Sequence, residues 1–475
     1  MAVDVQRKEE PAEVYDAIVV GAGIAGLGVA AKLQRAGMNT LCLDKNDQAG
    51  GRMQSFDLVG GWQLDIGLHM VELGDESSSA ALVRAVGKEV KWAGFSQSLE
   101  IYQYGCWHSL QDLIAASSKD IEQALMRIAA MDDQDIEAMD LMSWWDWLQE
   151  NTTTEQAREL LSIIGVIMTT ISDPKKMSAS EILYIARNNL YKKWNFLTAA
   201  YPVGGMRGII KPLQEAFEEA GGTLILNTCV GSVIIQDGVV KGVSIQKKRR
   251  SPYRGLNRIS DHCVVAAPVV VCAVPLWCID KILCLKLKTT ALPEWWISRF
   301  EDFKLETTGL IGYSIALSEE VYDKPNFLCS PKLGNSGLPF QAFVPSAFDP
   351  GVAPRGKSLL QTGCVVEIAQ IKDELEANRL LEAMWQDLQE MFPDIDGKVE
   401  WKFAYKSAAC DGLARKPGQV GAYKPDILAP GIEGLYFAGD SYRGRGLALN
   451  SAALSASICA NKILEKHGQR MLVAK

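Results

Sequence analysis

The hydrophobic pattern near the N-terminus predicts a strand, a helix and a second strand in quick succession. Residues 16–20 read Asp-Ala-Ile-Val-Val, a β-branched run that is typical of a buried strand. A helical stretch follows and ends at Gly37, which is placed as its C-terminal cap. Residues 38–43 are predicted to form a second strand, and Asp44 lies at its end. This order predicts one half of a parallel, Rossmann-like sheet.

Glycines fill the turn between the first strand and the helix. Gly21, Gly23 and Gly26 form a G-x-G-x-x-G motif. The first permits a tight turn, the second lets a phosphate approach the backbone, and the third lets helix and strand pack closely. Asp44 is placed to accept hydrogen bonds from a ribose diol, so the motif predicts a dinucleotide site. The predicted contacts of this site are Gly21, Gly23, Ile24, Ala25, Gly26, Asp44 and Lys45.

Two further glycines and an arginine follow the second strand. Residues 49–52 read Ala-Gly-Gly-Arg, and the glycines let the chain pass close to a pyrophosphate. Gly51 and Arg52 are predicted contacts, because a guanidinium can place a charged fork against the phosphates. A plain surface turn is the alternative. With the first motif, the sequence resembles the FAD-containing superfamily of amine oxidases, protoporphyrinogen oxidases and phytoene desaturases. The resemblance implies FAD, with its adenosine on the first motif.

A segment near the C-terminus matches the part of the superfamily that holds the flavin end of FAD. Residues 434–440 read Gly-Leu-Tyr-Phe-Ala-Gly-Asp, and a helix of small residues is predicted over 447–462. The resemblance implies that Gly439 and Asp440 bind the ribityl or pyrophosphate region. It also implies that the backbone N–H of Leu449 donates to flavin O2. The positive end of that helix favours the negative charge of reduced flavin.

A middle segment completes the predicted cofactor domain. An amphipathic helix opens after 203–206, a turn and strand cover 221–230, and Asp237-Gly238 forms a hairpin tip. This order resembles the superfamily's middle FAD segment, where the residue at Val230 touches adenine through its backbone. The predicted fold is therefore α/β: a Rossmann-like FAD-binding domain of the glutathione-reductase type with an inserted α+β substrate domain. The predicted boundaries are 1–75, 200–285 and 405–475 for the FAD-binding domain, and 76–199 and 286–404 for the substrate-binding domain.

Two stretches of the insert are unusually apolar. Residues 142–148 read Met-Ser-Trp-Trp-Asp-Trp-Leu, and 160–168 carry mostly branched aliphatic side chains. Core packing is one interpretation, because large aromatics usually fill interiors. The other is an apolar substrate tunnel or a patch resting on a membrane surface. We hypothesise that the substrate is largely hydrophobic.

Three side chains are candidates for a role in catalysis. The resemblance places an acid, a glycine and often a histidine near the flavin, and Asp65, Gly67 and His69 match them, so His69 is a candidate base or substrate anchor. The same segment makes Gly67, Leu68 and His69 candidate flavin contacts. Arg443 and Arg445 precede the last helix, and either can anchor a carboxylate or phosphate of the substrate. The alternatives are a purely structural histidine and a solvent-facing arginine loop.

Composition narrows the class of protein. The 475 residues are 48% hydrophobic and 22% charged, as in ordinary soluble domains. A net charge of −8 argues against a nucleic-acid partner. The eleven cysteines form no C-x-x-C pair and no metal-like cluster, so we expect reduced thiols, no metal and a cytoplasmic location. No signal peptide or membrane span is expected, whereas peripheral membrane contact and a homodimer stay open.

The resemblance implies hydride transfer from a substrate C–H bond to flavin N5. Amine oxidases of the superfamily usually carry an aromatic near the final helix and a lysine beside the flavin. Here residues 447–449 read Leu-Ala-Leu, and Lys304 is a poor match for that lysine. Both gaps favour desaturation of a C–C bond in a largely hydrophobic small molecule, with or without a carboxylate. Amine oxidation is the alternative, followed by a flavin-dependent isomerase and a non-catalytic prenyl- or lipid-binding escort; the electron acceptor stays open.

Overall fold

A five-stranded parallel sheet is built from three distant parts of the chain. The computed structural model describes residues 15–67, 69–96, 98–116, 119–193, 198–249, 258–284 and 292–473. The strand order is β10-β2-β1-β14-β20. Its strands are β1 (Ala17–Val20), β2 (Thr40–Leu43), β10 (Thr223–Ile225), β14 (Val269–Cys272) and β20 (Leu435–Phe437). Strands β1, β2, β14 and β20 are buried along their whole length, as expected for a parallel sheet covered on both faces.

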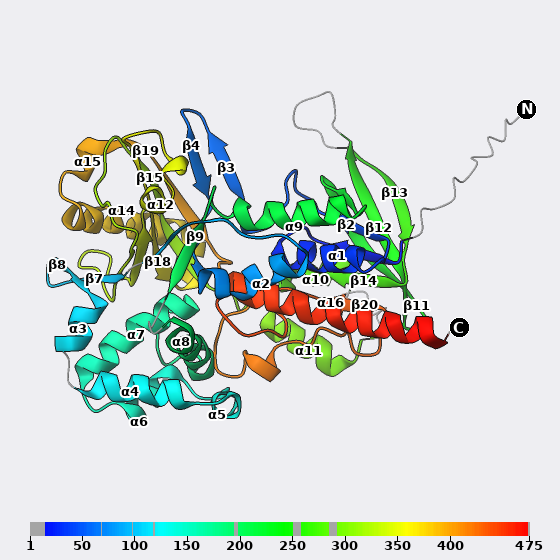
Figure 1. The fold of residues 1–475 in the computed structure, drawn as a ribbon, viewed down its shortest axis with the longest axis horizontal. Coiled ribbons are helices and arrows are strands. Elements are labelled where there is room, and N and C mark those ends of the chain that lie inside the picture. The colour runs from blue at the N-terminus through cyan, green and yellow to red at the C-terminus, as the bar shows by residue number, and fades with distance from the viewer. Residues whose placement is uncertain are drawn as a thin grey trace, which may run out of the picture.

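Helices cover one face of this sheet. Helix α1 (Ile24–Arg35) packs between α9 (Arg207–Glu219) and α16 (Ala448–Val473), as Figure 1 shows. The predicted strand, helix and strand at the N-terminus are confirmed. The capping residue of the helix is Ala36 and not the expected Gly37, which follows it with a φ of 90°. The predicted last helix is confirmed as well, although it runs eleven residues beyond the expected end at residue 462.

A three-stranded antiparallel sheet joins the cofactor side of the molecule. It consists of β11 (Thr228–Gln236), β12 (Val239–Arg249) and β13 (Arg258–Ala266). Asp237 and Gly238 link the first two strands with φ values of 52° and 72°. Positive φ at both central residues is what a tight type I′ hairpin requires, so the predicted hairpin tip is confirmed.

A seven-stranded mixed sheet forms the core of the inserted part. Its order is β19-β15-β18-β17-β16-β7-β8, and α14 (Glu374–Met391) packs on one face. The expected domain boundary between residues 404 and 405 falls within β19. The strands are β7 (Leu99–Gln103), β8 (Cys106–Ser109), β15 (Gly309–Leu317), β16 (Phe327–Ser330), β17 (Phe340–Phe343), β18 (Ser358–Val366) and β19 (Val399–Ser407).

A helical layer lies below this sheet in the view of Figure 1. Trp144 and Trp147 are buried and stacked with their ring centroids 4.9 Å apart, so these two aromatics pack in the core. The helices of this layer are α3 (Leu110–Ala116), α4 (Lys119–Ala130), α5 (Asp133–Ala138), α6 (Trp144–Asn151), α7 (Glu155–Thr169) and α8 (Ala179–Lys193).

Short elements connect the two sides of the molecule. None of the helices that the structure describes is long and apolar enough to cross a membrane. The connecting strands are β3 (Ser55–Leu58), β4 (Trp62–Asp65), β5 (Val71–Glu72), β6 (Trp92–Phe95) and β9 (Ala199–Pro202). The remaining helices are α2 (Ser78–Ala85), α10 (Leu276–Ile282), α11 (Glu294–Phe303), α12 (Pro345–Phe348), α13 (Ile368–Lys372) and α15 (Ile395–Lys398).

Candidate flavin site

The three motif glycines have different surroundings. A Cβ added to Gly21 would lie 2.5 Å from the Ala273 carbonyl oxygen, and one added to Gly26 would lie 1.7 Å from the Gly21 oxygen. Neither position has room for a side chain. At Gly23 the nearest atom among the described residues is the Cα of Gly51, 3.9 Å away. Packing therefore requires the first and third glycines, whereas the second leaves open space at the start of α1.

The Gly-Gly-Arg loop lies directly beside this open space. The Gly50 N–H donates to the Ala22 carbonyl at 2.8 Å, and Gly50 and Gly23 form an isolated parallel β-bridge. A Cβ on Gly51 would approach the Cα of Gly23 to 3.3 Å. The structure thus brings the two predicted phosphate-binding segments together at the N-terminus of α1, where free N–H groups attract an anion.

The carboxylate of Asp44 is fixed by hydrogen bonds at the end of β2. It is 7% exposed and accepts hydrogen bonds from the N–H groups of Ala22 at 2.7 Å and Asn46 at 2.8 Å, one on each oxygen. Each oxygen keeps a second lone pair for a ribose hydroxyl. The side chain of the neighbouring Lys45 is exposed to solvent.

Backbone hydrogen bonds connect Asp44 to the middle segment of the chain. Its N–H donates to the Ile225 carbonyl at 3.1 Å, and its carbonyl accepts from the Thr228 N–H at 2.8 Å. Val230 follows two residues later in β11, buried and next to a register shift in the strand pairing. Val230, the predicted adenine contact, therefore lies on the segment that is hydrogen-bonded to Asp44, the predicted ribose contact.

An ion pair joins the second motif to the C-terminal segment. The Arg52 guanidinium donates to the Asp440 carboxylate at 2.6 Å and to the Cys410 carbonyl at 2.9 Å. The other Asp440 oxygen accepts from the Gly412 N–H at 2.7 Å. Burial opposes the charge of Asp440, but the Arg52 guanidinium and these hydrogen bonds hold the pKa of the carboxyl below its usual value. Gly439, with a φ of 139°, makes the turn into this site.

The last helix begins with a free backbone donor. Leu449 is the second residue of α16, and none of the described residues accepts a hydrogen bond from its N–H. The side chain of Asn450 fixes the helix start, accepting from the Ser79 hydroxyl at 2.6 Å and donating to the Glu72 carbonyl at 3.1 Å. Because first-turn N–H groups have no partner within a helix, this end of α16 is suited to a hydrogen-bond acceptor.

His69 lies beside a buried carboxylate. Asp65 is 1% exposed and accepts from the Tyr201 hydroxyl at 2.8 Å and from the Met206 N–H at 3.2 Å. The Nδ1 atom of His69 is buried and has no partner in the described structure. Burial lowers the pKa of His69 against the opposing effect of Asp65, so the imidazole is neutral near pH 7. Gly67 touches this ring, since a Cβ there would lie 3.1 Å from His69 Cε1; Leu68 lies outside the described residues.

Gln361 reaches the same segment from the seven-stranded sheet. Its side-chain N–H donates to the Asp65 carbonyl at 2.8 Å, which fixes the orientation of the amide. The amide oxygen is buried and has no partner in the described part of the chain. The segment from Asp65 to His69 therefore has two unpaired buried polar atoms at or next to it, His69 Nδ1 and Gln361 Oε1. Leaving such a group unpaired costs about 1–3 kcal/mol, so both are suited to a ligand.

The two predicted anchor arginines are engaged by protein carboxylates. Arg445 has only 13% of its side chain exposed and pairs with Asp140 at 2.7 Å and with Glu181 at 3.4 Å. Arg443 is about half exposed and pairs with Asp426 at 3.3 Å. These pairs account for both guanidinium charges without a substrate, and the anchoring role stays a prediction.

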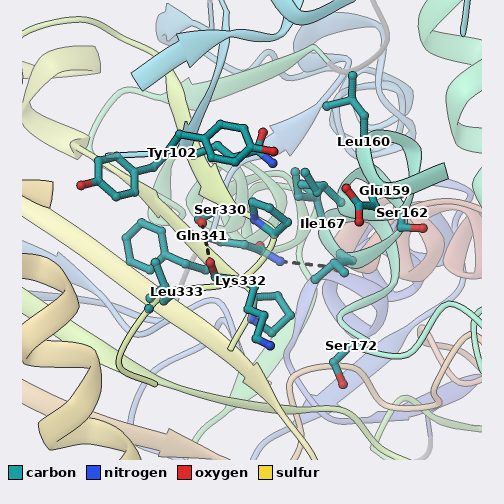
Figure 2. A pocket seen from close by; sticks show the side chains of 18 of the residues that line it. Tyr102, Glu159, Leu160, Ser162, Ile167, Ser172, Ser330, Lys332, Leu333 and Gln341 are labelled. Carbon is teal, nitrogen blue, oxygen red and sulfur yellow. Dashed lines mark hydrogen bonds between the residues drawn. The ribbon is translucent and has the colours of Figure 1, made fainter. Parts of the chain in front are cut away.

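A cavity of about 1000 Å³ lies between α7 and the seven-stranded sheet. Figure 2 shows Leu160 and Ile167 of α7 on one wall, with Tyr102 and Leu333 on the wall formed by the sheet side. Residues 160–168 pack in the core, and several of them also line this cavity. Core packing and a substrate site are therefore both compatible with the structure. The charged residues around it are Glu155, Glu159, Lys332, Asp387 and Glu390.

Comparison with known protein families decides what this architecture is. Residues 19–85 match the NAD(P)-binding Rossmann-like domain, and residues 121–464 match the flavin containing amine oxidoreductase. The second match covers more than half of the chain. The chain belongs to the flavin-containing amine oxidoreductase family. The expected superfamily and the Rossmann-like α/β fold are therefore confirmed.

Relatives of the chain have several activities. The chain is 24% identical to an all-trans-retinol 13,14-reductase of Danio rerio, over 54% of the chain and 47% of the relative. It is 23% identical to a 15-cis-phytoene desaturase of Synechococcus elongatus, over 54% and 57%. The chain thus spans about half the length of each. A prolycopene isomerase of an Oncidium hybrid cultivar is 21% identical over 96% of the chain and 85% of the relative.

Solved structures share the fold across nearly the whole chain. An oxidoreductase of Methanosarcina mazei superposes with a TM-score of 0.74 at 20% identity, over 94% of this chain and 99% of that one. A cyclohexylamine oxidase of Brevibacterium oxydans gives 0.66 at 16% identity, over 96% and 100%. At these identities the likeness establishes the fold alone.

Family membership identifies the protein as a flavin-dependent oxidoreductase, and the residues fit FAD. The open space at Gly23, the Arg52–Asp440 pair and the free Leu449 N–H lie on the first and last of the three segments that the sequence assigned to FAD. When bound, FAD supplies a two-electron acceptor for hydride. Sequence reasoning missed Gln361, since it stands in no motif and its hydrogen bond to Asp65 spans 296 positions.

Proposed function

We propose that this oxidoreductase desaturates a C–C bond of a largely hydrophobic small molecule. The observation that carries the proposal is the cavity beside α7, which Leu160, Ile163, Val166 and Ile167 line with branched apolar side chains. Cavities with such walls bind ligands mainly by removing apolar surface from water. The named substrates of three relatives, retinol, phytoene and prolycopene, are hydrophobic molecules of this kind.

His69 is the candidate base of this reaction. Desaturation removes a hydride from one carbon, which FAD accepts, and a proton from the neighbouring carbon. The neutral imidazole of His69 has a buried nitrogen without a partner among the described residues, and it can accept that proton. A carboxylate on the substrate gains no support, because Arg443 and Arg445 already pair with Asp426, Asp140 and Glu181.

Amine oxidation is the second candidate, and one feature of the cavity favours it. Glu155 and Glu159 of α7, with Asp387 and Glu390 of α14, outnumber Lys332 among the charged side chains around the cavity. Such an excess of negative charge attracts a cation. Putrescine oxidase and cyclohexylamine oxidase are among the structural neighbours.

Anaerobic flavin reduction discriminates between these candidates. The FAD-loaded protein is mixed with a panel of apolar polyenes and, separately, with primary and secondary amines. Loss of the oxidised flavin absorbance with a polyene but no amine supports desaturation, and the reverse supports amine oxidation. Ile167→Trp fills the cavity and should slow the reduction by the true substrate at least tenfold without changing the flavin spectrum. Met126→Trp, at a position 61% exposed on α4, is the matched control.

A further inference from the structure

Lys424 is a buried cation that the proposed chemistry does not use. The residue is 3% exposed and follows the short turn at Gly421–Tyr423. Its Nζ donates to the Asp440 carbonyl at 3.0 Å, to the Gly444 carbonyl at 2.9 Å and to the Ser451 hydroxyl at 3.0 Å. The Ser451 hydroxyl donates its own proton to the Gly444 carbonyl at 2.9 Å, so it can only accept from Lys424, as the two carbonyls do. Three such acceptors around one nitrogen require three N–H donors, which only the protonated ammonium provides. The geometry therefore selects the charged form despite the burial.

These contacts connect the Lys424 ammonium to the loop and the helix start that are predicted to hold the flavin. Asp440 is the predicted contact of the ribityl or pyrophosphate region, and Leu449 is the predicted donor to flavin O2. Lys424 binds the loop that joins them and the first turn of α16 through Ser451. The inference below rests on FAD occupying this site and not on the identity of the substrate.

The ion pairs around Lys424 contain one more carboxylate than guanidinium groups. On the loop and on neighbouring elements, Asp440 pairs with Arg52, Asp411 pairs with Arg415, and Arg445 pairs with both Asp140 and Glu181. This cluster holds four carboxylates and three guanidinium groups, and the Lys424 ammonium supplies the fourth positive charge. No carboxylate of the described residues lies within ion-pair distance of it. Loss of the Lys424 proton leaves these ion-paired groups with a net charge of −1.

Reduced flavin gains negative charge on its pyrimidine ring, and a nearby buried charge shifts the free energy of that step. We propose that the Lys424 ammonium raises the reduction potential of the bound FAD and that flavin reduction is coupled to protonation of this lysine. Burial lowers the pKa of Lys424 to about 8, with Arg415 acting in the same direction and Glu181, Asp440 and Asp411 opposing. The coupling therefore operates close to physiological pH.

The test is the reduction potential of FAD in the full-length protein as a function of pH. A chemical reductant and a reference dye are used, so no substrate is needed. The potential is measured between about pH 6 and 10. Above about pH 8, reduction of the wild-type protein should take up one additional proton per two electrons. This steepens the potential by about 30 mV per pH unit. Lys424→Met should lose that steepening and should lower the equilibrium constant for reduction at pH 7 about tenfold, or about 30 mV.

Lys462→Met is the matched control. It removes a lysine charge from α16, eleven residues beyond Ser451, where Lys462 pairs with Asp426 at 3.6 Å. Its potential and pH dependence should equal those of the wild type. Identical curves for Lys424→Met and the wild type overturn the proposal, as does a wild type without the steepening.

A third variant tests the coupling of Lys424 to flavin reduction if the Lys424→Met protein does not bind FAD. Ser451→Ala removes one acceptor of the ammonium but keeps the lysine, so the steepening should begin at a lower pH than in the wild type. An unchanged onset overturns the proposal. A wild type that binds no FAD contradicts the cofactor assignment itself, whereas a failed polyene assay leaves the role of Lys424 standing.

Discussion

Replacing Gly23 by alanine separates cofactor binding from folding. Gly23 has a φ of −76° and a ψ of −178°, which is extended backbone that alanine adopts without strain. The nearest described atom to the new Cβ is the Gly51 Cα at 3.9 Å, an ordinary contact. A Gly→Ala change at such a position stabilises a protein by about 0.4–1 kcal/mol, because it reduces the freedom of the unfolded chain. The cofactor-free protein should therefore be as stable as the wild type or slightly more stable.

The same methyl group should strongly weaken FAD binding. It enters the space at the N-terminus of α1, where the pyrophosphate is expected to accept hydrogen bonds from free N–H groups. A hydrogen bond to a charged group contributes about 1.5–3 kcal/mol, so losing two of them costs about 3–6 kcal/mol. This corresponds to a fall in affinity of about 10²- to 10⁴-fold.

Two measurements and two controls test this reasoning. Chemical denaturation of the cofactor-free protein gives the free energy of unfolding, and titration with FAD gives the affinity. Gly397→Ala has nothing within 4 Å of its new Cβ and should change neither quantity by more than the ordinary gain in stability. Gly26→Ala should fail to fold stably, since its Cβ would lie 1.7 Å from the Gly21 oxygen. A Gly23→Ala protein that binds FAD like the wild type would refute the assignment of this turn.

Three further outcomes follow from the buried charges and the cavity. Arg445→Met leaves Asp140 and Glu181 without their cation, and should lower the free energy of unfolding by about 3–5 kcal/mol in denaturant titrations; an unchanged midpoint contradicts this. The lowered pKa of His69 means that the unfolded chain binds its proton more tightly, so stability should fall as the pH drops below about 6.5. His69→Asn should flatten that acid loss, and equal pH profiles would count against a buried neutral imidazole. Ile167→Trp should reduce turnover at least tenfold with FAD affinity unchanged, and normal turnover would remove the cavity from the reaction.

The sequence predicts the cofactor side of the fold well because its signals are local. The strand, glycine turn and helix at residues 16–37 follow from hydrophobic periodicity and from glycines that have no room for a side chain. The Asp237-Gly238 hairpin follows from turn chemistry alone. The Gly-Asp pair at 439–440 and the helix after it are equally short-range patterns.

The inserted part and the polar network could not be predicted in the same way. Strand β7 pairs with β16 more than two hundred residues later, and no local pattern specifies that register. Arg445 was expected in solvent or on a substrate, yet its carboxylate partners lie 264 and 305 positions away. Lys424 sits in an unremarkable stretch of sequence, and only the folded chain places its nitrogen among three oxygen atoms. Long-range packing decides these contacts, so they appear only in the structure.

Anaerobic mixing of the FAD-loaded protein with apolar polyenes tests the proposed function most directly. The proposed function predicts that at least one polyene bleaches the oxidised flavin and emerges with one additional C=C bond. It also predicts that the flavin of the Ile167→Trp variant, whose tryptophan fills the cavity beside α7, is bleached at least tenfold more slowly. Bleaching by amines alone, or equal rates in wild type and Ile167→Trp, would contradict it.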